Sequence, residues 1–253
     1  MRITVKFQLD DRLVLPINYQ HILQGFIYRT LGDDDFSAFL HNDGFHKGKR
    51  SFKLFTFSRI FGKNKVDVKN KQITFFDEVE WHVGSILPQF IQNLCQNLLT
   101  APENRLLGYP ISVQEVSYNK LKIHSSRCLI KMLSPITVYS TYEDESGKKK
   151  TQFFDPNDNA FPVLIEQNLI KKYEAYYGKA PERRSFSITP IDIHPRDKVV
   201  TRYKNFIINA WGGTYEVRSS PELIQFAYAV GIGGKNSQGF GMFGILKVEE
   251  NEY

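Results

Sequence analysis

Residues 231–241 read Gly-Ile-Gly-Gly-Lys-Asn-Ser-Gln-Gly-Phe-Gly, and this glycine-rich loop is the most distinctive stretch of the chain. The flanking patterns predict a helix over 220–230 before it and a strand over 242–248 after it. Dinucleotide and P-loop sites run the other way, from strand to helix, and no Walker pattern is present. Dense glycines allow positive φ and close approach to another surface, and they can aim N–H groups at a phosphate. A purely structural turn is the alternative.

The rest of the chain predicts one order of elements twice. In the first half we expect strand 2–9, a helix introduced by Pro16 and Asn18 and ending near 31, a short helix 34–41, strands 53–59, 65–68, 72–76 and 81–83, helix 86–99 and strand 111–118. In the second half we expect strands 128–132 and 136–141, helix 161–177, strands 186–193, 199–203 and 206–217, helix 220–230 and strand 242–248. Strand, helix, strands, helix, strand is the order of a ferredoxin-like fold. We therefore predict an α+β protein with two tandem ferredoxin-like (split βαβ) domains, 1–122 and 123–253, although no sequence repeat is visible.

The bulk composition favours a basic protein with an anionic partner. The 253 residues include 33 Lys and Arg against 27 Asp and Glu, a net charge of +6. Such a surplus favours nucleic acid. Cys95 and Cys128 form no CxxC pair, so neither a disulfide framework nor a zinc knuckle is indicated. We find no signal peptide and no apolar run of membrane-spanning length, so we expect a soluble, cytoplasmic protein without a membrane partner.

Four segments share their pattern with one protein family. They are Leu-Ile-Gln-Phe-Ala-Tyr-Ala-Val at 223–230 with the glycine-rich loop, Pro-Ile-Asn-Tyr-Gln-His-Ile-Leu-Gln-Gly-Phe-Ile-Tyr at 16–28, Phe-Leu-His at 39–41 with Lys-Leu-Phe-Thr-Phe-Ser at 53–58, and Leu-Ser-Pro-Ile at 133–136. The combination resembles the RAMP superfamily of CRISPR-associated proteins and, within it, the endoribonucleases that process repeat RNA. The resemblance covers roughly residues 1–60 and 209–253, and between them it rests on the order of elements.

The resemblance implies a metal-independent endoribonuclease with a histidine, tyrosine and lysine site. The matching positions are His41, Tyr28 and Lys53. At about 100° per helical residue, Tyr28 points roughly 150° away from the apolar stripe of its helix, which is unusual for a core tyrosine. His41 likewise faces away from the apolar residues of its helix. Lys49 stays an alternative to Lys53, and His46 an alternative to His41, because both lie in a basic cluster between those two positions.

The chemistry suits these residue types. RNA supplies its own nucleophile, the 2′-hydroxyl, so the site must move protons and offset the charge on the phosphorane. Histidine, with a reference pKa near 6.5, serves proton transfer near neutrality, whereas tyrosine, near 10, fits a hydrogen-bonding or proton-relay partner. Lys53 supplies the positive charge. The expected products are a 2′,3′-cyclic phosphate and a 5′-hydroxyl.

RNA contacts are expected from the loop and from basic clusters. Arg202 and Lys204 alternate with apolar residues along a predicted strand, so they share a face that can follow an RNA backbone. We expect N–H groups of the loop to contact RNA, so that bulky residues at Gly233 and Gly239 weaken binding while the fold survives. The predicted RNA-binding residues are Gly231, Gly233, Gly234, Lys235, Gly239, Gly241, Lys47, Lys49, Arg50, Arg202 and Lys204.

We expect no cofactor and no metal site. The six histidines show no HxxxH or HxxEH pairing, and Asp33-Asp34-Asp35 is typical of a helix N-terminus. The expected partner is CRISPR repeat RNA, the precursor of guide RNAs. Other CRISPR-associated proteins of an effector complex are further candidates, and monomer and homodimer both stay open. The alternative function is a non-catalytic RAMP subunit that holds guide RNA in such a complex, which needs the loop and the basic surface but not a catalytic site.

Overall fold

The computed structural model describes residues 1–32, 35–203 and 206–248. The elements of the first half are β1 (Arg2–Pro16), α1 (Gln20–Leu31), α2 (Asp35–Asn42), β2 (Phe45–Lys47), β3 (Arg50–Phe52), β4 (Phe55–Phe57), β5 (Phe61–Asp67), β6 (Gln72–Ser85), α3 (Pro88–Thr100), β7 (Asn104–Leu106) and β8 (Tyr109–Asn119). Those of the second half are β9 (Arg127–Met132), β10 (Tyr139–Glu143), β11 (Lys149–Phe153), α4 (Ala160–Tyr177), β12 (Phe186–Asp192), the 3₁₀ turn η1 (Pro195–Asp197), β13 (Lys198–Tyr203), β14 (Phe206–Trp211), β15 (Thr214–Ser219), α5 (Pro221–Val230), the 3₁₀ turn η2 (Asn236–Gln238) and β16 (Phe243–Val248).

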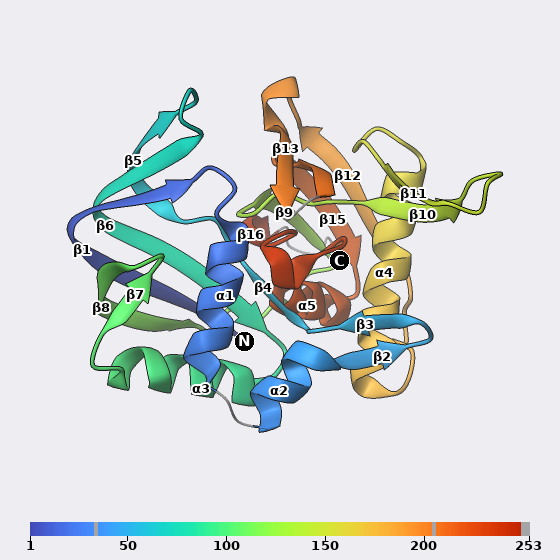
Figure 1. The fold of residues 1–253 in the computed structure, drawn as a ribbon. Coiled ribbons are helices and arrows are strands. Elements are labelled where there is room, and N and C mark those ends of the chain that lie inside the picture. The colour runs from blue at the N-terminus through green and yellow to red at the C-terminus, as the bar shows by residue number, and fades with distance from the viewer. Residues whose placement is uncertain (33–34, 204–205, 249–253) are drawn as a thin grey trace.

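Two antiparallel sheets have the same strand order. The first is ordered β4-β6-β1-β8-β7, with β5 paired along β6, and the second is ordered β12-β15-β9-β16. Along the chain, the four strands of the split βαβ repeat are β1, β4, β6 and β8 in the first half and β9, β12, β15 and β16 in the second. In both sheets the third and first of these strands lie in the centre, and the second and fourth lie outside them. This arrangement confirms the prediction of two ferredoxin-like domains. Figure 1 shows the first sheet on the left and the second on the right, with the hairpin β2–β3 of the first half reaching across to α4. The domain limits 1–122 and 123–253 stay a prediction, with the boundary between β8 and β9.

Short hairpins are inserted into both repeats. β2 and β3 form one between α2 and β4, β10 and β11 form one between β9 and α4, and β13 and β14 form one between β12 and β15. Figure 1 shows the last two projecting away from the second sheet. The hairpin β13–β14 also contacts α1 and the turn before it, because Thr201 Oγ1 donates to Asn18 Oδ1 of the turn at 2.7 Å and the Tyr203 hydroxyl donates to Gln24 Oε1 of α1 at 2.5 Å.

The two halves share one continuous hydrophobic core, and a buried cation lies where they meet. Arg2, 3% exposed, donates from β1 to the carbonyl oxygens of Phe243 and Tyr228, both at 2.6 Å. Its guanidinium carbon lies 3.5 Å from the centre of the Tyr228 ring. Burial lowers the pKa of Arg2 to about 10. These contacts tie the first strand to α5 and to β16.

The strand limits differ from the sequence-based predictions in β1, in β6 and at Gly212-Gly213, which separate β14 from β15. β1 extends to Pro16, with a register shift between Gln8 and Arg12. The predicted strands 72–76 and 81–83 are one strand, β6, and the predicted strand 206–217 is two strands in different sheets. A register shift lets a strand continue past residues that break the period-two pattern. Such a strand therefore looks like a strand followed by a loop.

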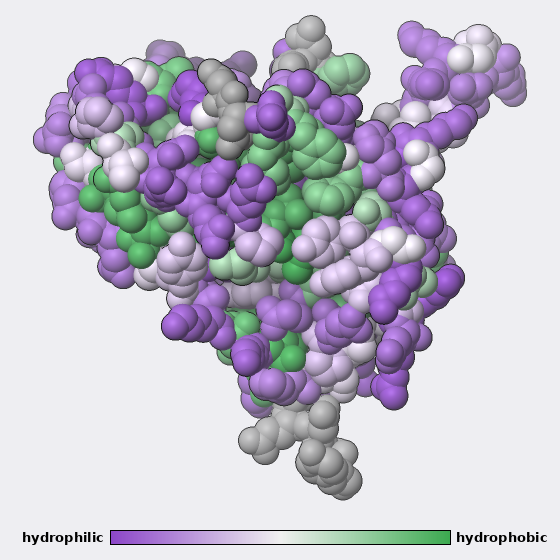
Figure 2. Space-filling view, turned by 90° about the horizontal axis from the view of Figure 1, so that it is seen from below, coloured by the Kyte–Doolittle hydropathy of each residue, from purple (hydrophilic) through white to green (hydrophobic). Residues whose placement is uncertain are grey.

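The surface is mixed in polarity. Figure 2 shows the face seen from below, where hydrophilic side chains cover most of the area and hydrophobic ones lie among them in patches. Within the described ranges, every helix is too short or too polar to cross a membrane.

Candidate active site and RNA-binding cleft

The three predicted catalytic residues lie together. Tyr28 is on α1, His41 is near the end of α2, and Lys53 is in the short connection between β3 and β4. The Tyr28 and His41 rings meet edge to face with centroids 4.8 Å apart, and Tyr28 packs in the same way on Phe55. Lys53 Nζ donates a hydrogen bond to the backbone oxygen of His41 at 2.9 Å. The structure thus brings one proton-transfer group, one phenol and one cation to a single place.

The surroundings give each side chain a different character. Tyr28 is half-buried, and this burial, with a smaller effect of the nearby Tyr203, raises the pKa of Tyr28, so its hydroxyl stays protonated at neutral pH. His41 is exposed, and its Nδ1 lies 3.0 Å from Asn42 Oδ1. Because that amide oxygen can only accept, it favours a proton on Nδ1 and leaves the Nε2 lone pair available in the neutral ring. Partial burial lowers the pKa of Lys53, an effect that Asp43 opposes.

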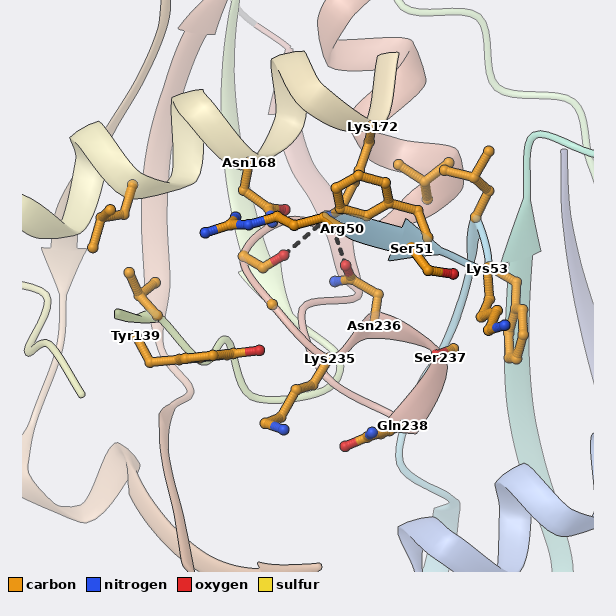
Figure 3. Close-up of a pocket in the computed structure, with 18 of the residues that line it drawn as sticks. Arg50, Ser51, Lys53, Tyr139, Asn168, Lys172, Lys235, Asn236, Ser237 and Gln238 are labelled. Atoms are coloured by element: carbon orange, nitrogen blue, oxygen red, sulfur yellow. Dashed lines mark hydrogen bonds between the residues drawn. The ribbon is translucent and has the colours of Figure 1, made fainter. Parts of the chain in front are cut away.

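His41 and Lys53 line a cleft of about 750 Å³ that is bounded by both halves of the chain. β3 supplies Arg50 on one side, and α4 and the glycine-rich loop supply the other. Figure 3 shows Arg50, Asn168, Tyr139 and Lys235 around this space. The Tyr28 side chain is not part of its lining. The cleft is large enough for a nucleotide, and polar side chains from distant parts of the chain converge on it.

The glycine-rich loop wedges between the halves. Its glycines are required there because positive φ and close packing coincide: a Cβ at Gly241 would lie 1.9 Å from the Ile232 oxygen, with φ +75°. A Cβ at Gly239 would lie 2.6 Å from the Phe57 ring of β4. One at Gly233 would lie 2.7 Å from the Thr137 oxygen. The loop backbone therefore approaches other parts of the protein closely, as the sequence led us to expect of some surface. The expectation that bulky residues at Gly233 and Gly239 leave the fold intact does not fit this packing.

Most of the loop's N–H groups donate inside the protein. The N–H of Gly231 donates to Ala227, that of Gly234 to Thr137, that of Gly239 to Asn236 and that of Gly241 to Pro135. These four groups are satisfied, so they do not form a row directed at a phosphate. Contact between the loop and RNA stays a prediction, and residues 233–238 are the part of the loop that lines the cleft.

A buried lysine holds the loop in place. Lys172 of α4 is 3% exposed, and its Nζ donates to the oxygens of Gly231 and Gly233, both at 3.0 Å, and to Asn236 Oδ1 at 2.6 Å. Figure 3 shows this side chain descending from α4 onto the loop. Burial lowers the pKa of Lys172 to about 7. Three acceptors match the three hydrogens of an ammonium group, so Lys172 fixes the loop's shape.

The other predicted basic residues are dispersed. Lys47 pairs with Glu174 of α4 at 3.1 Å, and Lys49 is exposed at the turn of the hairpin β2–β3. Arg202 is exposed on β13, on the face opposite Thr201. Lys204 lies outside the described residues. Of the predicted RNA-binding residues that the structure describes, Arg50, Gly233, Gly234 and Lys235 line the cleft.

The sequence reasoning missed some of the cleft residues. Lys172 had a usable signal, because it falls on the apolar stripe of its helix after Ile165 and Leu169, where a charged residue needs an explanation. Tyr139 and Asn168 had none, because only the packing of the two halves brings them to the cleft. Within the described ranges, no three His, Cys, Asp or Glu side chains gather as a metal-binding group would require.

Two comparisons identify the class of protein. A solved structure described as a RAMP protein binding different RNA substrates superimposes with a TM-score of 0.82, at 22% identity, over 98% of this chain and all of that one, and it shows the fold. A second, described as CRISPR associated protein Cas6, gives a TM-score of 0.78 at 28% identity over 98% of this chain and 99% of that one. The chain therefore has the architecture of RAMP proteins.

Family comparisons are more specific. The family "CRISPR-associated protein Cas6, N-terminal" matches residues 14–117, and "CRISPR associated protein Cas6, C-terminal" matches residues 117–245. The chain belongs to the Cas6 family. A Methanocaldococcus jannaschii relative, named CRISPR-associated endoribonuclease Cas6 1, is 28% identical over 99% of this chain and 94% of its own length.

Proposed function

We propose that this protein is an endoribonuclease that binds CRISPR repeat transcripts and cuts them to release guide RNAs, without using a metal ion. Membership of the Cas6 family and the full-length likeness to a relative named as an endoribonuclease support RNA cleavage. The single observation that carries the site assignment is the grouping of Tyr28, His41 and Lys53 at the edge of a cleft bordered by basic side chains.

The proposed mechanism uses the 2′-hydroxyl next to the scissile phosphate as the nucleophile. Two protons move in this step: His41 Nε2 carries one of them, as base toward the 2′-hydroxyl or as acid toward the leaving 5′-oxygen, and solvent water carries the other. Lys53 offsets the charge of the phosphorane, and the Tyr28 phenol, which stays protonated, donates a hydrogen bond. The 2′-oxygen–phosphorus bond forms as the bond from phosphorus to the 5′-oxygen breaks. The products are a 2′,3′-cyclic phosphate and a 5′-hydroxyl.

The test is incubation of the purified protein with the repeat RNA of its own CRISPR array in excess EDTA, with the product ends identified by mass spectrometry. We expect one cut per repeat, a cyclic phosphate and a 5′-hydroxyl. A matched RNA with a 2′-deoxy nucleotide at the cut should stay intact, because it lacks the nucleophile. A strict need for added Mg²⁺ or Mn²⁺, or a 5′-phosphate product, would overturn the mechanism. Tight binding of the repeat without cleavage under either condition would favour the non-catalytic RAMP subunit instead.

A further inference from the structure

An aromatic side chain is held rigidly inside the cleft. Tyr139, at the start of β10, is half-buried and packs on Phe153 with ring centroids 5.8 Å apart. Lys235 Nζ lies 5.3 Å from the centre of the Tyr139 ring. The absence of a side chain at Gly234 lets the loop backbone pack against the Tyr139 ring, because a Cβ there would lie 2.7 Å from the ring. Lys235 itself has φ +56°, a conformation that residues with side chains adopt rarely and mostly where it serves a purpose.

The polar groups around this ring are not all satisfied. Asn168 Oδ1 and Gln238 Oε1 are buried in the cleft wall, and neither has a hydrogen-bond partner among the described residues. A buried polar atom without a partner is unfavourable, so a ligand that donates to it gains affinity. Figure 3 shows Asn168 and Arg50 on one side of the Tyr139 ring and Lys235 on the other, with the tyrosine hydroxyl directed to the centre of the cleft.

We propose that these residues form a subsite for one unpaired nucleotide of the RNA substrate. The base stacks on the Tyr139 face turned toward Asn168, whose amide, with that of Gln238, pairs with the polar edge of the base. Arg50 contacts the phosphate of the same nucleotide, and Lys235 holds the opposite face of the ring. Aromatic faces, amides and a guanidinium are the groups that proteins use for single-stranded RNA.

The nucleotide must be unpaired because a base inside a duplex is covered on both faces by its neighbours. Only a base taken out of the stack can lie against a side-chain ring. The subsite shares its cleft with His41 and Lys53, so the bound nucleotide belongs to the strand that passes the scissile phosphate. This inference rests on the proposed function and specifies its substrate: repeat RNA that is single-stranded at one position close to the cut.

The test is a scan of abasic sites along the repeat RNA, which carries a 2′-deoxy nucleotide at the cut so that binding is measured without cleavage. Wild-type protein should lose about tenfold in affinity at one position near the cut. Tyr139→Leu should bind the intact RNA about tenfold more weakly and become insensitive to the abasic site at that position. Tyr139→Phe should behave as wild type. Tyr142→Leu is the matched control, because Tyr142 lies on the same strand, is 50% exposed and is not part of the cleft lining.

The outcomes separate the subsite from the proposed function. Equal sensitivity of wild type and Tyr139→Leu at every position overturns the subsite, even if the normal RNA is cut. If wild type is sensitive to an abasic site at one position and Tyr139→Leu is not, but wild type never cuts normal repeat RNA, the subsite is supported and the proposed function is overturned. Wild-type protein that does not bind repeat RNA overturns both. If free nucleoside monophosphates bind in a Tyr139-dependent manner and leave RNA affinity unchanged, the cleft holds a free nucleotide and the proposal is wrong.

Discussion

The rings of Tyr28 and His41 pack edge to face, with 4.8 Å between their centroids. This contact joins α1 to the end of α2 and leaves His41 exposed at the mouth of the cleft. Because His41 fills no part of the core, its replacement should open no cavity and lower the free energy of unfolding little.

His41→Ala should therefore abolish most cleavage while RNA affinity stays nearly intact. Loss of a proton-transfer group typically lowers the rate by about 10²–10⁴. Single-turnover rates with saturating protein measure the effect on the chemical step, and His46→Ala and His21→Ala are the controls. Cleavage by His41→Ala within threefold of wild type would remove His41 from the site, and a large loss at His46 would move the assignment there.

Tyr28→Phe should slow cleavage without lowering stability. The substitution keeps the ring contacts with His41 and Phe55 and removes only the hydroxyl. A hydrogen bond to a charged group is worth about 1.5–3 kcal/mol, which corresponds to a rate loss of about tenfold or more. Thermal unfolding and single-turnover rates of the same sample separate the two effects. An unchanged rate would make Tyr28 a packing residue that positions His41.

Lys53 and Lys49 should differ in what their loss affects. Lys53 lines the cleft and reaches the His41 oxygen, whereas Lys49 is exposed at the hairpin turn. Lys53→Ala should slow the chemical step about tenfold or more, with partial rescue by Lys53→Arg, because the positive charge returns. Lys49→Ala should change affinity and leave the rate at saturation unchanged. The reverse pattern would make Lys49 the catalytic cation.

Arg202→Ala should weaken RNA binding and leave the cleavage rate at saturation unchanged. Each lost phosphate contact lowers the slope of log affinity against log salt by about 0.7 for single strands and about 0.9 for duplex, so Arg202→Ala should reduce the slope by about that amount. Binding titrations at four salt concentrations measure it. If Arg202→Ala binds normally and cuts slowly, the residue acts in the chemistry instead.

Lys172 should make stability depend on pH. Burial lowers its pKa to about 7, from 10.5 for the exposed side chain, so the unfolded chain binds more protons between these values. This group's contribution to stability therefore increases as pH rises from about 7 toward 10, by at most ~1.4 kcal/mol per pH unit. Urea unfolding at pH 7 and pH 9 should show a smaller rise for Lys172→Met than for wild type. Lys171→Met, on the same helix, is the control, and an equal rise in all three proteins would contradict this linkage.

The sequence predicted the order of elements better than their limits. Ferredoxin-like order was readable because both repeats keep a long apolar helix between strands, as in the stripe of Ile22, Leu23, Phe26 and Ile27 on α1. The hairpin β2–β3 was missed because its two three-residue strands are too short for a period-two pattern. Their pairing depends on a turn and on packing against α4, which no local pattern records.

The site could be predicted from the sequence where the family resemblance supplied matching positions, as it did for Tyr28, His41 and Lys53. Tyr28 was selected because it matches the tyrosine that the family resemblance implies, and its position off the apolar stripe of α1 agreed with that choice. In the structure it is half-buried all the same, because α2 and β4 cover that side of the helix with His41 and Phe55. The subsite around Tyr139 joins segments that are nearly two hundred positions apart in the chain, from Arg50 to Gln238. Its residues become neighbours only through tertiary packing, so the sequence alone gives no reason to group them.

The buried Arg2 has a consequence for the order in which the chain folds during synthesis. Its two carbonyl partners, on Tyr228 and Phe243, leave the ribosome more than two hundred residues after it. Until then the first sheet must keep this guanidinium in water, so the surface that later meets α5 stays open to solvent. Closure of the molecule is thus a late event that waits for α5 and for β16, the last strand that the structure describes. A nascent chain stalled before Tyr228 would expose that apolar surface to chaperones and proteases.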